Sequence, residues 1–305
     1  MAARNGLQAA WTGAGKSRMW TLYLQVPLAL LIPAGVVLGA GQARVEKSFH
    51  AVPNCRIKIF NPGGGTIVVR GWDKEEVHAV CLTNSPKIEI DSDPTPANDE
   101  AEKVDFTTHI LDPQASSQEK TASYELDVPK DSSLVISSPE GSISVEHING
   151  DDSIESVNGA VSVSDGAGMV RVRSLNANIN FIRPTGRVEA TSIMGNLTFT
   201  GSESTKIEAH TESGKITFDG DFLPVGDYVL KTYAGDVSVT CPTSDSFALD
   251  AHSLRGKVDN QFKLSRKAHV PYPSHGDSAF GTNNRGDASV TVKSFSGTIH
   301  VRPRF

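Results

Sequence analysis

A repeat of 18 to 21 residues runs through this chain from about Leu134 to Phe305, and it restricts the fold to a stack of similar turns. Each repeat is framed by a glycine, or in one case an alanine, and only the last step, of 41 residues, departs from the period. The frame positions are Gly141, Gly159, Ala177, Gly195, Gly214, Gly235, Gly256 and Gly297. Because the last step equals about two periods, we expect one irregular segment near the C-terminus.

Residues at fixed distances from the frame share their chemistry, which a chance spacing of glycines would not produce. Two residues after the frame, every side chain is aliphatic: Ile143, Val161, Ile179, Leu197, Ile216, Val237, Val258 and Ile299. Five residues before it, every side chain is apolar: Ile136, Ile154, Val172, Ala190, Ala209, Leu230, Ala251 and Val292. Three residues before it, every side chain carries a hydroxyl: Ser138, Ser156, Ser174, Ser192, Thr211, Thr232, Ser253 and Ser294. Apolar and variable positions alternate on either side of the frame, so each repeat predicts two half-buried strands with a corner between them.

The predicted fold is all-β: a single-domain β-solenoid, similar to a right-handed β-helix, in which each turn stacks on the next. Glycine suits the corner because it adopts positive φ without steric cost. Stacking places aliphatic residues over one another and lets the hydroxyl column hydrogen-bond along the stack. We divide the chain into an apolar signal or anchor helix (1–43), an N-terminal solenoid turn with further strands (44–133) and the regular repeats (134–305). Polar loops are expected at 91–103 and 265–287.

An earlier turn fits the frame in part at Gly65, with Phe60 five residues before it and Ile67 two residues after it. Lys58 and Pro62 stand where the other repeats have an apolar residue and a hydroxyl residue. We therefore expect a less regular turn at this end of the solenoid.

Residues 1–43 have the order of an export signal: basic residues, an apolar stretch from Trp20 to Ala40, and then small residues. Gly41 and Ala43 would permit cleavage after Ala43. The same stretch is long enough to span a bilayer as an uncleaved anchor, with its basic flank in the cytoplasm. Signal and anchor remain alternatives. Either one exports the remainder to the periplasm or cell surface, or holds it at the membrane facing outward.

Charge and cysteine content narrow the classes of partner and cofactor. The net charge is −6 and no long basic run occurs, so nucleic acid is not expected as a partner. Cys55, Cys81 and Cys241 show no metal-binding spacing, and we expect no metal and no cofactor. Free buried thiols are favoured. A disulfide between Cys55 and Cys81 is the alternative in an oxidising compartment.

Three stretches of the chain resemble a known bacterial family. They are GGTIVVRGWDKEEVHAV, YELDVPKDSSLVISSPEGSISVEHINGD and ASVTVKSFSGTIHV, with NGAVSV-like turns between the last two. Together they resemble the bacterial putative-adhesin family, which is named as a domain of unknown function, over about Lys47 to Phe305. The resemblance implies a β-solenoid or β-helix that is exported or attached to a membrane. It carries no established catalytic residues.

We predict no enzymatic activity. The outward column four residues before the frame contains one acid, Glu155, and the two histidines His210 and His252. A polysaccharide-active β-helix enzyme that uses these three side chains is the alternative. Glu155 is expected to form an exposed ion pair with Arg173 on the next turn. Arg285 to Asp287 spells a cell-attachment tripeptide, which we attribute to chance.

A further column, two residues before the frame, is apolar and is interrupted by Glu212. Its members are Val157, Leu175, Ile193, Tyr233, Leu254 and Phe295. If the corner turns them inward they belong to the core, which is the interpretation we favour. If they point outward they form an interaction surface for a partner or a membrane.

Taken together, these patterns favour a non-enzymatic, exported or membrane-attached cell-envelope protein. Its rigid adhesin-type solenoid would present a surface that binds an envelope protein, a glycan or a cell surface. The alternatives are the polysaccharide-active enzyme and an envelope sensor domain on a membrane anchor.

Overall fold

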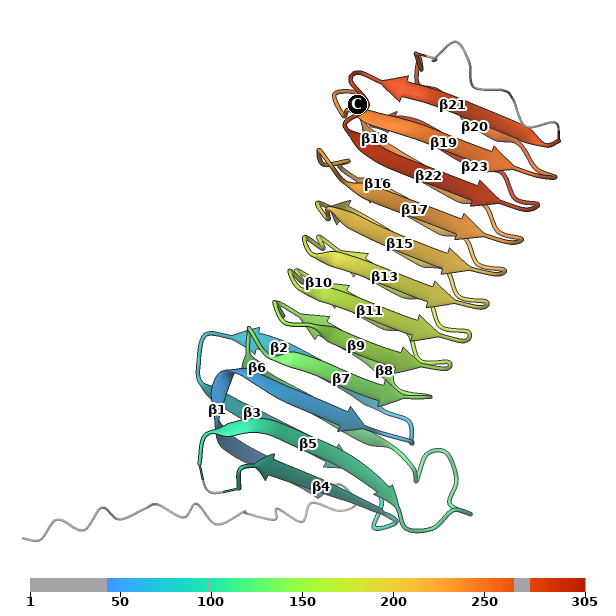
Figure 1. The fold of residues 1–305 in the computed structure, drawn as a ribbon. Helices are drawn as coiled ribbons and strands as arrows, with labels where there is room; N and C mark the ends of the chain where they lie inside the picture. The colour runs from blue at the N-terminus through green and yellow to red at the C-terminus, as the bar shows by residue number, and fades with distance from the viewer. Residues whose placement is uncertain (1–42, 98, 266–274, 305) are drawn as a thin grey trace, which may run out of the picture. The chain divides into compact units, whose positions relative to one another are not determined.

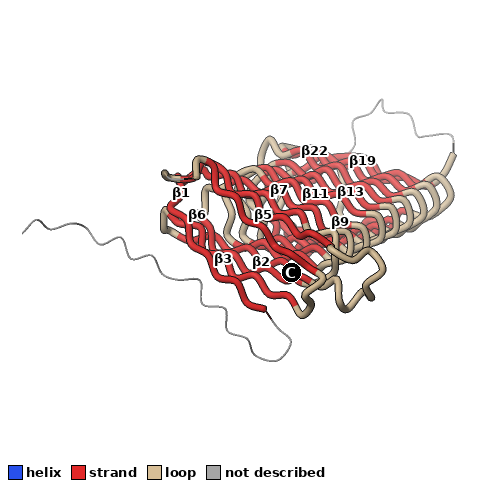
Figure 2. Tube along the Cα trace, turned by 90° about the horizontal axis from the view of Figure 1, so that it is seen from below, coloured by secondary structure: helices blue, strands red, loops and turns tan. Residues whose placement is uncertain are grey.

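The computed structural model describes residues 43–97, 99–265 and 275–304. In these ranges the chain forms 23 β-strands and no helix, arranged as two sheets that share a core (Figures 1 and 2). The all-β, solenoid-like fold predicted from the repeat is confirmed. The predicted signal or anchor lies outside the described residues, except for Ala43, which begins the first strand. No helix in the described part of the chain is long and apolar enough to cross a membrane.

Sheet 1 contains the strand that precedes each frame residue, and sheet 2 contains the strand that follows it. Along the stack, sheet 1 contains β4 (Ile88–Thr95), β5 (Ala101–Ile110), part of β1 (Ala43–Phe60), β7 (Ser133–Ser138), β9 (Asp152–Ser156), β11 (Met169–Ser174), β13 (Arg187–Ser192), β15 (Lys206–Thr211), β17 (Asp227–Thr232), β22 (Ala288–Ser294), β19 (Phe247–Ser253) and β21 (Asp277–Asn283). In the same direction, sheet 2 contains the rest of β1, β3 (Glu76–Thr83), β6 (Ala122–Pro129), β2 (Thr66–Trp72), β8 (Ser142–Glu146), β10 (Val161–Ser164), β12 (Ile179–Ile182), β14 (Leu197–Ser202), β16 (Ile216–Gly220), β18 (Val237–Pro242), β23 (Ile299–Arg304) and β20 (Val258–Asn260).

The strand register places like residues over one another, as the repeat predicts. Val161 lies opposite Ile179, which in turn lies opposite Leu197. The column five residues before the frame is at most 1% exposed in every coil. The column two residues after the frame is buried everywhere except at Val258, which is partly buried. Burial of one such side chain is worth about 1.5–3 kcal/mol, so the ladders shared by neighbouring coils stabilise the stack.

The hydroxyl column ties each corner to itself and to the adjacent coil. Thr232 Oγ1 accepts a hydrogen bond from the N–H of Gly235 at 3.0 Å and donates one to the carbonyl oxygen of Gly214 at 3.2 Å. The same two contacts recur at three further corners, those of Thr211, Ser253 and Ser294. The predicted hydrogen bonding along the stack is therefore confirmed at these corners.

The frame glycines allow a close approach of backbones, whereas the sequence suggested that they supply positive φ. None of those from Gly141 to Gly297 has a positive φ. A Cβ added to Gly235 would lie 1.9 Å from the carbonyl oxygen of Gly214, the frame residue of the adjacent coil. At the corner of Gly235 the backbones are thus stacked at a distance that leaves no room for a side chain. Close approach, and not positive φ, is the physical reason for glycine there.

The first turn, at Gly65, has one residue more in its corner than the others. Ile59 pairs with Ile136, so Ile59 occupies the inward column, and Phe60 is 41% exposed. Asn61, the next residue, is fully buried and donates hydrogen bonds to two backbone carbonyl oxygens, one in its own corner and one in the adjacent coil. The prediction that Phe60 points inward is therefore wrong. This shift by one residue explains why Lys58 and Pro62 appeared as exceptions to the columns.

Both ends of the stack depart from chain order. The last coil, β22 with β23, lies between the coil of β17 and β18 and the coil of β19 and β20. The first coil, β1 with β2, lies between β5 with β6 and β7 with β8. Antiparallel strands then cover the outer coils: β4 lies on β5, β3 on β6 and β21 on β19.

The two segments predicted to be polar loops contain strands. Residues 91–95 belong to β4 and residues 101–103 to β5, so the first loop is much shorter than predicted. In the second segment, residues 277–283 form β21, while residues 266–274 lie outside the described ranges. Strands β4 and β21 are edge strands, and edge strands carry polar and charged residues that resemble the composition of a loop.

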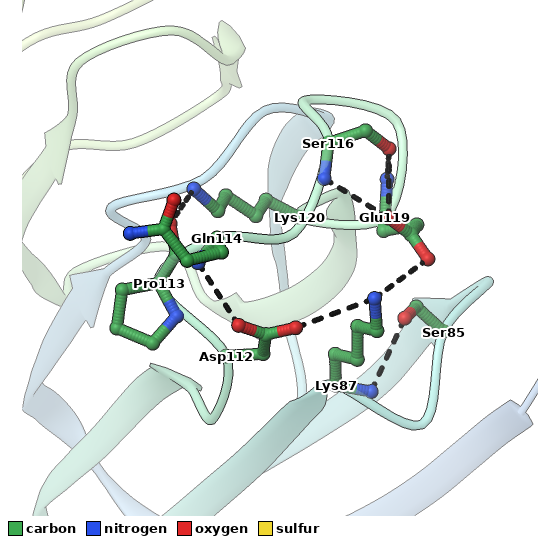
Figure 3. Close-up of polar contacts among 8 residues, drawn as sticks. All are labelled: Ser85, Lys87, Asp112, Pro113, Gln114, Ser116, Glu119 and Lys120. Atoms are coloured by element: carbon green, nitrogen blue, oxygen red, sulfur yellow. Dashed lines mark hydrogen bonds and ion pairs between the residues drawn. The ribbon is translucent and has the colours of Figure 1, made fainter.

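An ion-pair cluster links the loop between β5 and β6 to Lys87 (Figure 3). Lys87 Nζ lies 3.3 Å from a carboxylate oxygen of Asp112 and 3.0 Å from one of Glu119. The backbone N–H and the hydroxyl of Ser116 also donate to Glu119, and together with Lys87 these donors lower the pKa of Glu119 to about 2. The cluster is at the surface, so it orders the loop more than it stabilises the fold.

One acid lies in the core. Asp152 occupies an inward column between Leu134 and Val170 and is 3% exposed. Neither of its carboxylate oxygens has a hydrogen-bond partner among the described residues. Burial raises the pKa of Asp152 to about 8. An ionised carboxylate without a partner is costly in such a position, so the folded chain keeps this group protonated at neutral pH.

We expect Gly235→Ala to lower the free energy of unfolding by about 1–3 kcal/mol, because the new methyl group must displace the stacked backbone. Ala177 shows that one corner accommodates a methyl group, so the variant should still fold. Gly166→Ala is the matched control, since a Cβ there would meet its nearest atoms at 3.6 Å. Chemical denaturation compares the two variants, and equal stabilities would contradict the close-approach explanation.

Asp152→Asn should stabilise the protein at pH 8 and have little effect near pH 4. In the unfolded chain the carboxyl titrates near 3.8, whereas in the folded chain its pKa is about 8. Between these values folding takes up a proton, so stability falls as pH rises and levels off above about pH 8. Thermal unfolding at pH 4, 6 and 8 measures the difference, which should reach several kcal/mol. A difference that does not depend on pH would show that Asp152 is ionised in the folded state.

Candidate interaction surface

The apolar column two residues before the frame lies on the outside of the corner. Its members, which we call the corner stripe, are Val157, Leu175, Ile193, Tyr233, Phe295 and Leu254. Leu175 is 42% exposed, Ile193 39% and Tyr233 58%, while Val157 and Phe295 are partly buried. The favoured interpretation of this column as core is therefore wrong. The physical reason is strand alternation: the hydroxyl three residues before the frame points inward, so the next residue along faces solvent.

The end of the corner stripe near the C-terminus is ordered by the inserted last coil. In space Phe295 lies between Tyr233 and Leu254, because β22 lies between β17 and β19. The rings of Tyr233 and Phe295 stack with centroids 4.5 Å apart and planes at 5°. The guanidinium of Arg255 lies 4.9 Å from the centroid of Phe295. In this part of the stripe the two rings and the guanidinium thus form one stack, of which Tyr233 is 58% exposed.

The other end of the corner stripe borders a shallow hollow of about 320 Å³. Its lining includes Val157 and Leu175 of the stripe and the charged residues Glu155 and Arg173. The predicted ion pair between Glu155 and Arg173 is not formed, although the two residues are opposite one another on neighbouring strands. Arg173 instead lies 4.0 Å from Glu189. Glu189 lies on the next strand, where it also contacts Arg171 at 2.7 Å.

The three side chains of the enzymatic alternative are not brought together. Glu155, His210 and His252 lie on β9, β15 and β19, and each is separated from the next by two intervening strands. Neighbouring strands are about 4.7–4.9 Å apart, so successive members of the trio are about 14 Å apart along the stack. Paired catalytic carboxyl groups of glycosidases lie about 5–9.5 Å apart. The geometry therefore gives no support to a shared catalytic centre.

The Arg285 to Asp287 tripeptide forms an ordered turn between β21 and β22. Gly286 has a φ of +76°, and the hydroxyl of Ser246 accepts hydrogen bonds from the backbone N–H groups of Arg285 and Asp287. The Arg285 guanidinium donates to the Asp287 carboxylate at 2.8 Å. The two charged side chains are thus paired with each other. The contact with Arg285 lowers the pKa of the Asp287 carboxyl group.

The three cysteines are free and buried, as favoured from the sequence. Burial raises the pKa of Cys55 to about 11 and that of Cys81 to about 12, and it also raises the pKa of Cys241. Such thiols are poor nucleophiles at neutral pH. In the ranges that the structure describes, His, Cys, Asp and Glu side chains form no group of three or more suited to a metal ion.

No family model matches this sequence, and no curated protein matches it. Two solved structures each align with 85% of the chain. One is described as a putative cell adhesion protein from Clostridium sporogenes ATCC 15579; it is 12% identical, 99% of its chain is covered, and the TM-score is 0.26. The other is described as a putative adhesin from Bacteroides fragilis NCTC 9343; it is 11% identical, with 97% covered and a TM-score of 0.43. The solenoid itself is established by this chain's own strand register.

The exposure of the corner stripe predicts that Leu175→Lys with Ile193→Lys is tolerated. Surface substitutions typically change stability by less than about 0.5 kcal/mol each, because the charged ends remain in water. Leu230→Ala in the inward column is the control and should cost about 2–5 kcal/mol. Denaturant titration of both variants is the measurement. A larger loss in the double lysine variant than in Leu230→Ala would place the stripe in the core.

Proposed function

We propose that this protein is a non-enzymatic cell-envelope protein, exported or attached to the membrane, that acts as an adhesin-like scaffold. The solenoid would present the corner stripe to another envelope protein, a glycan or a cell surface. Residues Val157, Leu175 and Ile193, and separately Tyr233, Phe295 and Leu254, would form the two contact areas, with Glu212 between them.

The observation that carries this proposal is the exposure of large apolar side chains in one column of an otherwise regular surface. Leu175, Ile193, Tyr233 and Leu254 are each at least 39% exposed, and they share one corner of the stack. Apolar side chains grouped in this way on a surface are typical of sites that bind proteins, ligands or membranes. The stacked coils hold these side chains in a fixed line, so little ordering would be required when a partner binds.

The test compares cells that produce the full chain with cells that produce Leu175→Ser, Ile193→Ser and Tyr233→Ser combined. We expect the parent to be found in the envelope fraction and to promote cell attachment or cell–cell aggregation, because the apolar contacts hold the partner. The triple variant should be exported normally but should lose most of this effect. Fractionation and an attachment assay measure the two properties separately.

A matched control replaces three exposed apolar residues outside the corner: Phe60→Ser, Leu111→Ser and Val225→Ser. These side chains are 41%, 58% and 91% exposed. This control should attach like the parent. Recovery of the parent in the cytoplasm, or equal attachment by the corner variant, would refute the proposal.

A further inference from the structure

Four basic side chains form a row on the outer face of sheet 1, beside the corner stripe. His210, Lys231, Lys293 and His252 lie opposite one another on the consecutive strands β15, β17, β22 and β19. The inserted last coil brings Lys231 and Lys293 side by side. Neighbouring strands lie about 4.7–4.9 Å apart, so the row extends about 14 Å along the stack. We call these four residues the basic row.

The basic row is only partly neutralised. Like charges directly opposite on neighbouring strands are destabilising. Lys293 Nζ lies 3.9 Å from a carboxylate oxygen of Asp250, whereas Lys231 has no ion pair among the described residues. His252 Nδ1 lies 3.1 Å from the hydroxyl of Ser278 on β21. Two adjacent exposed lysines, of which only Lys293 has a carboxylate partner, leave positive charge available for an anionic ligand.

The surroundings of the basic row indicate what kind of anion fits. Glu208 and Asp250 lie beside it on the same face, and Glu212 lies at the corner. These carboxylates lower the positive charge that any polyanion would meet, but they can accept hydrogen bonds from hydroxyl groups, which a polysaccharide carries on every sugar. On the corner side, the stacked rings of Tyr233 and Phe295 offer an apolar edge. A polymer with carboxylates, many hydroxyls and apolar C–H groups matches all three features.

We propose that the basic row and the adjoining rings bind a linear acidic polysaccharide that runs along the solenoid axis. Lys231 and Lys293 contact its carboxylates, and the flanking acids accept hydrogen bonds from its hydroxyls. This inference rests on the proposed function and names the ligand class for one end of the same surface. It assigns binding and no reaction.

The experiment measures binding of the purified full chain to polygalacturonate by isothermal titration calorimetry. Lys231→Gln with Lys293→Gln should weaken binding by about tenfold or more, since two charged contacts are lost. Arg56→Gln with Lys58→Gln is the matched control: it removes the same charge from the same sheet face, but from one strand, β1. The control should bind like the parent. Neutral dextran should not bind.

Several outcomes would overturn the inference. They are no binding of polygalacturonate by the parent, an equal loss in the control variant, or tighter binding of single-stranded oligo(dT), which would identify the row as a nucleic-acid site. Thermal unfolding should show that Lys231→Gln with Lys293→Gln is at least as stable as the parent, because a like-charge contact is removed. Since binding is measured without cells, a negative result leaves the attachment test of the corner stripe unaffected.

Discussion

At four corners, those of Thr211, Thr232, Ser253 and Ser294, a single hydroxyl group bonds two backbones at once. Thr232 accepts from the N–H of its own frame residue and donates to the frame carbonyl of the adjacent coil. It can reach both only when the corners are in contact, and that contact excludes a Cβ at Gly235. The interaction therefore fixes the register of neighbouring coils. Register in turn decides which side chains lie over one another, so both the buried ladders and the rows on the outer face depend on it.

Regular stacking leaves the problem of the two ends, where unpaired backbone groups would invite pairing with other chains. This chain places its first and last coils one position inside the stack, so that β23 is paired with β18 on one side and β20 on the other. Antiparallel strands then cover the outer coils of sheet 1. The last strand of the described chain, β23, is thus paired on both sides, and so is the part of β1 from Arg56 to Phe60, which lies between β5 and β7. The first part of β1, Ala43 to His50, pairs only with β3 and forms an edge of sheet 2.

Features that depend on the residues of a single coil can be predicted from the sequence. The inward columns and the hydroxyl need only local alternation, and in the repeats from Gly141 to Gly297 they are found where expected, with Val258 only partly buried. The outward direction of Leu175 and Ile193 also follows from that alternation, because the inward hydroxyl precedes each of them by one position. The neighbours of Lys293 could not be predicted, since Lys231 and His252 are 62 and 41 residues away in the chain and nothing within a coil specifies which coil lies beside it. The extra corner residue before Gly65 could not be predicted for the same reason, because only the pairing of Ile59 with Ile136 shows it.

The insertion that protects the C-terminal end also shapes the outer surface there. In chain order Lys231 would be followed by His252, and Tyr233 by Leu254. The inserted coil instead places lysine against lysine and ring against ring. The stacked rings are favourable, and Arg255 adds a cation–π contact to Phe295. The opposed lysines are unfavourable, and no contact among the described residues neutralises Lys231. A fold that needed only a closed end could carry any polar residue at position 293. Lys293 contacts Asp250 on the neighbouring strand, whereas Lys231 has no such partner among the described residues, so the closed end leaves one positive charge of the pair open to solvent.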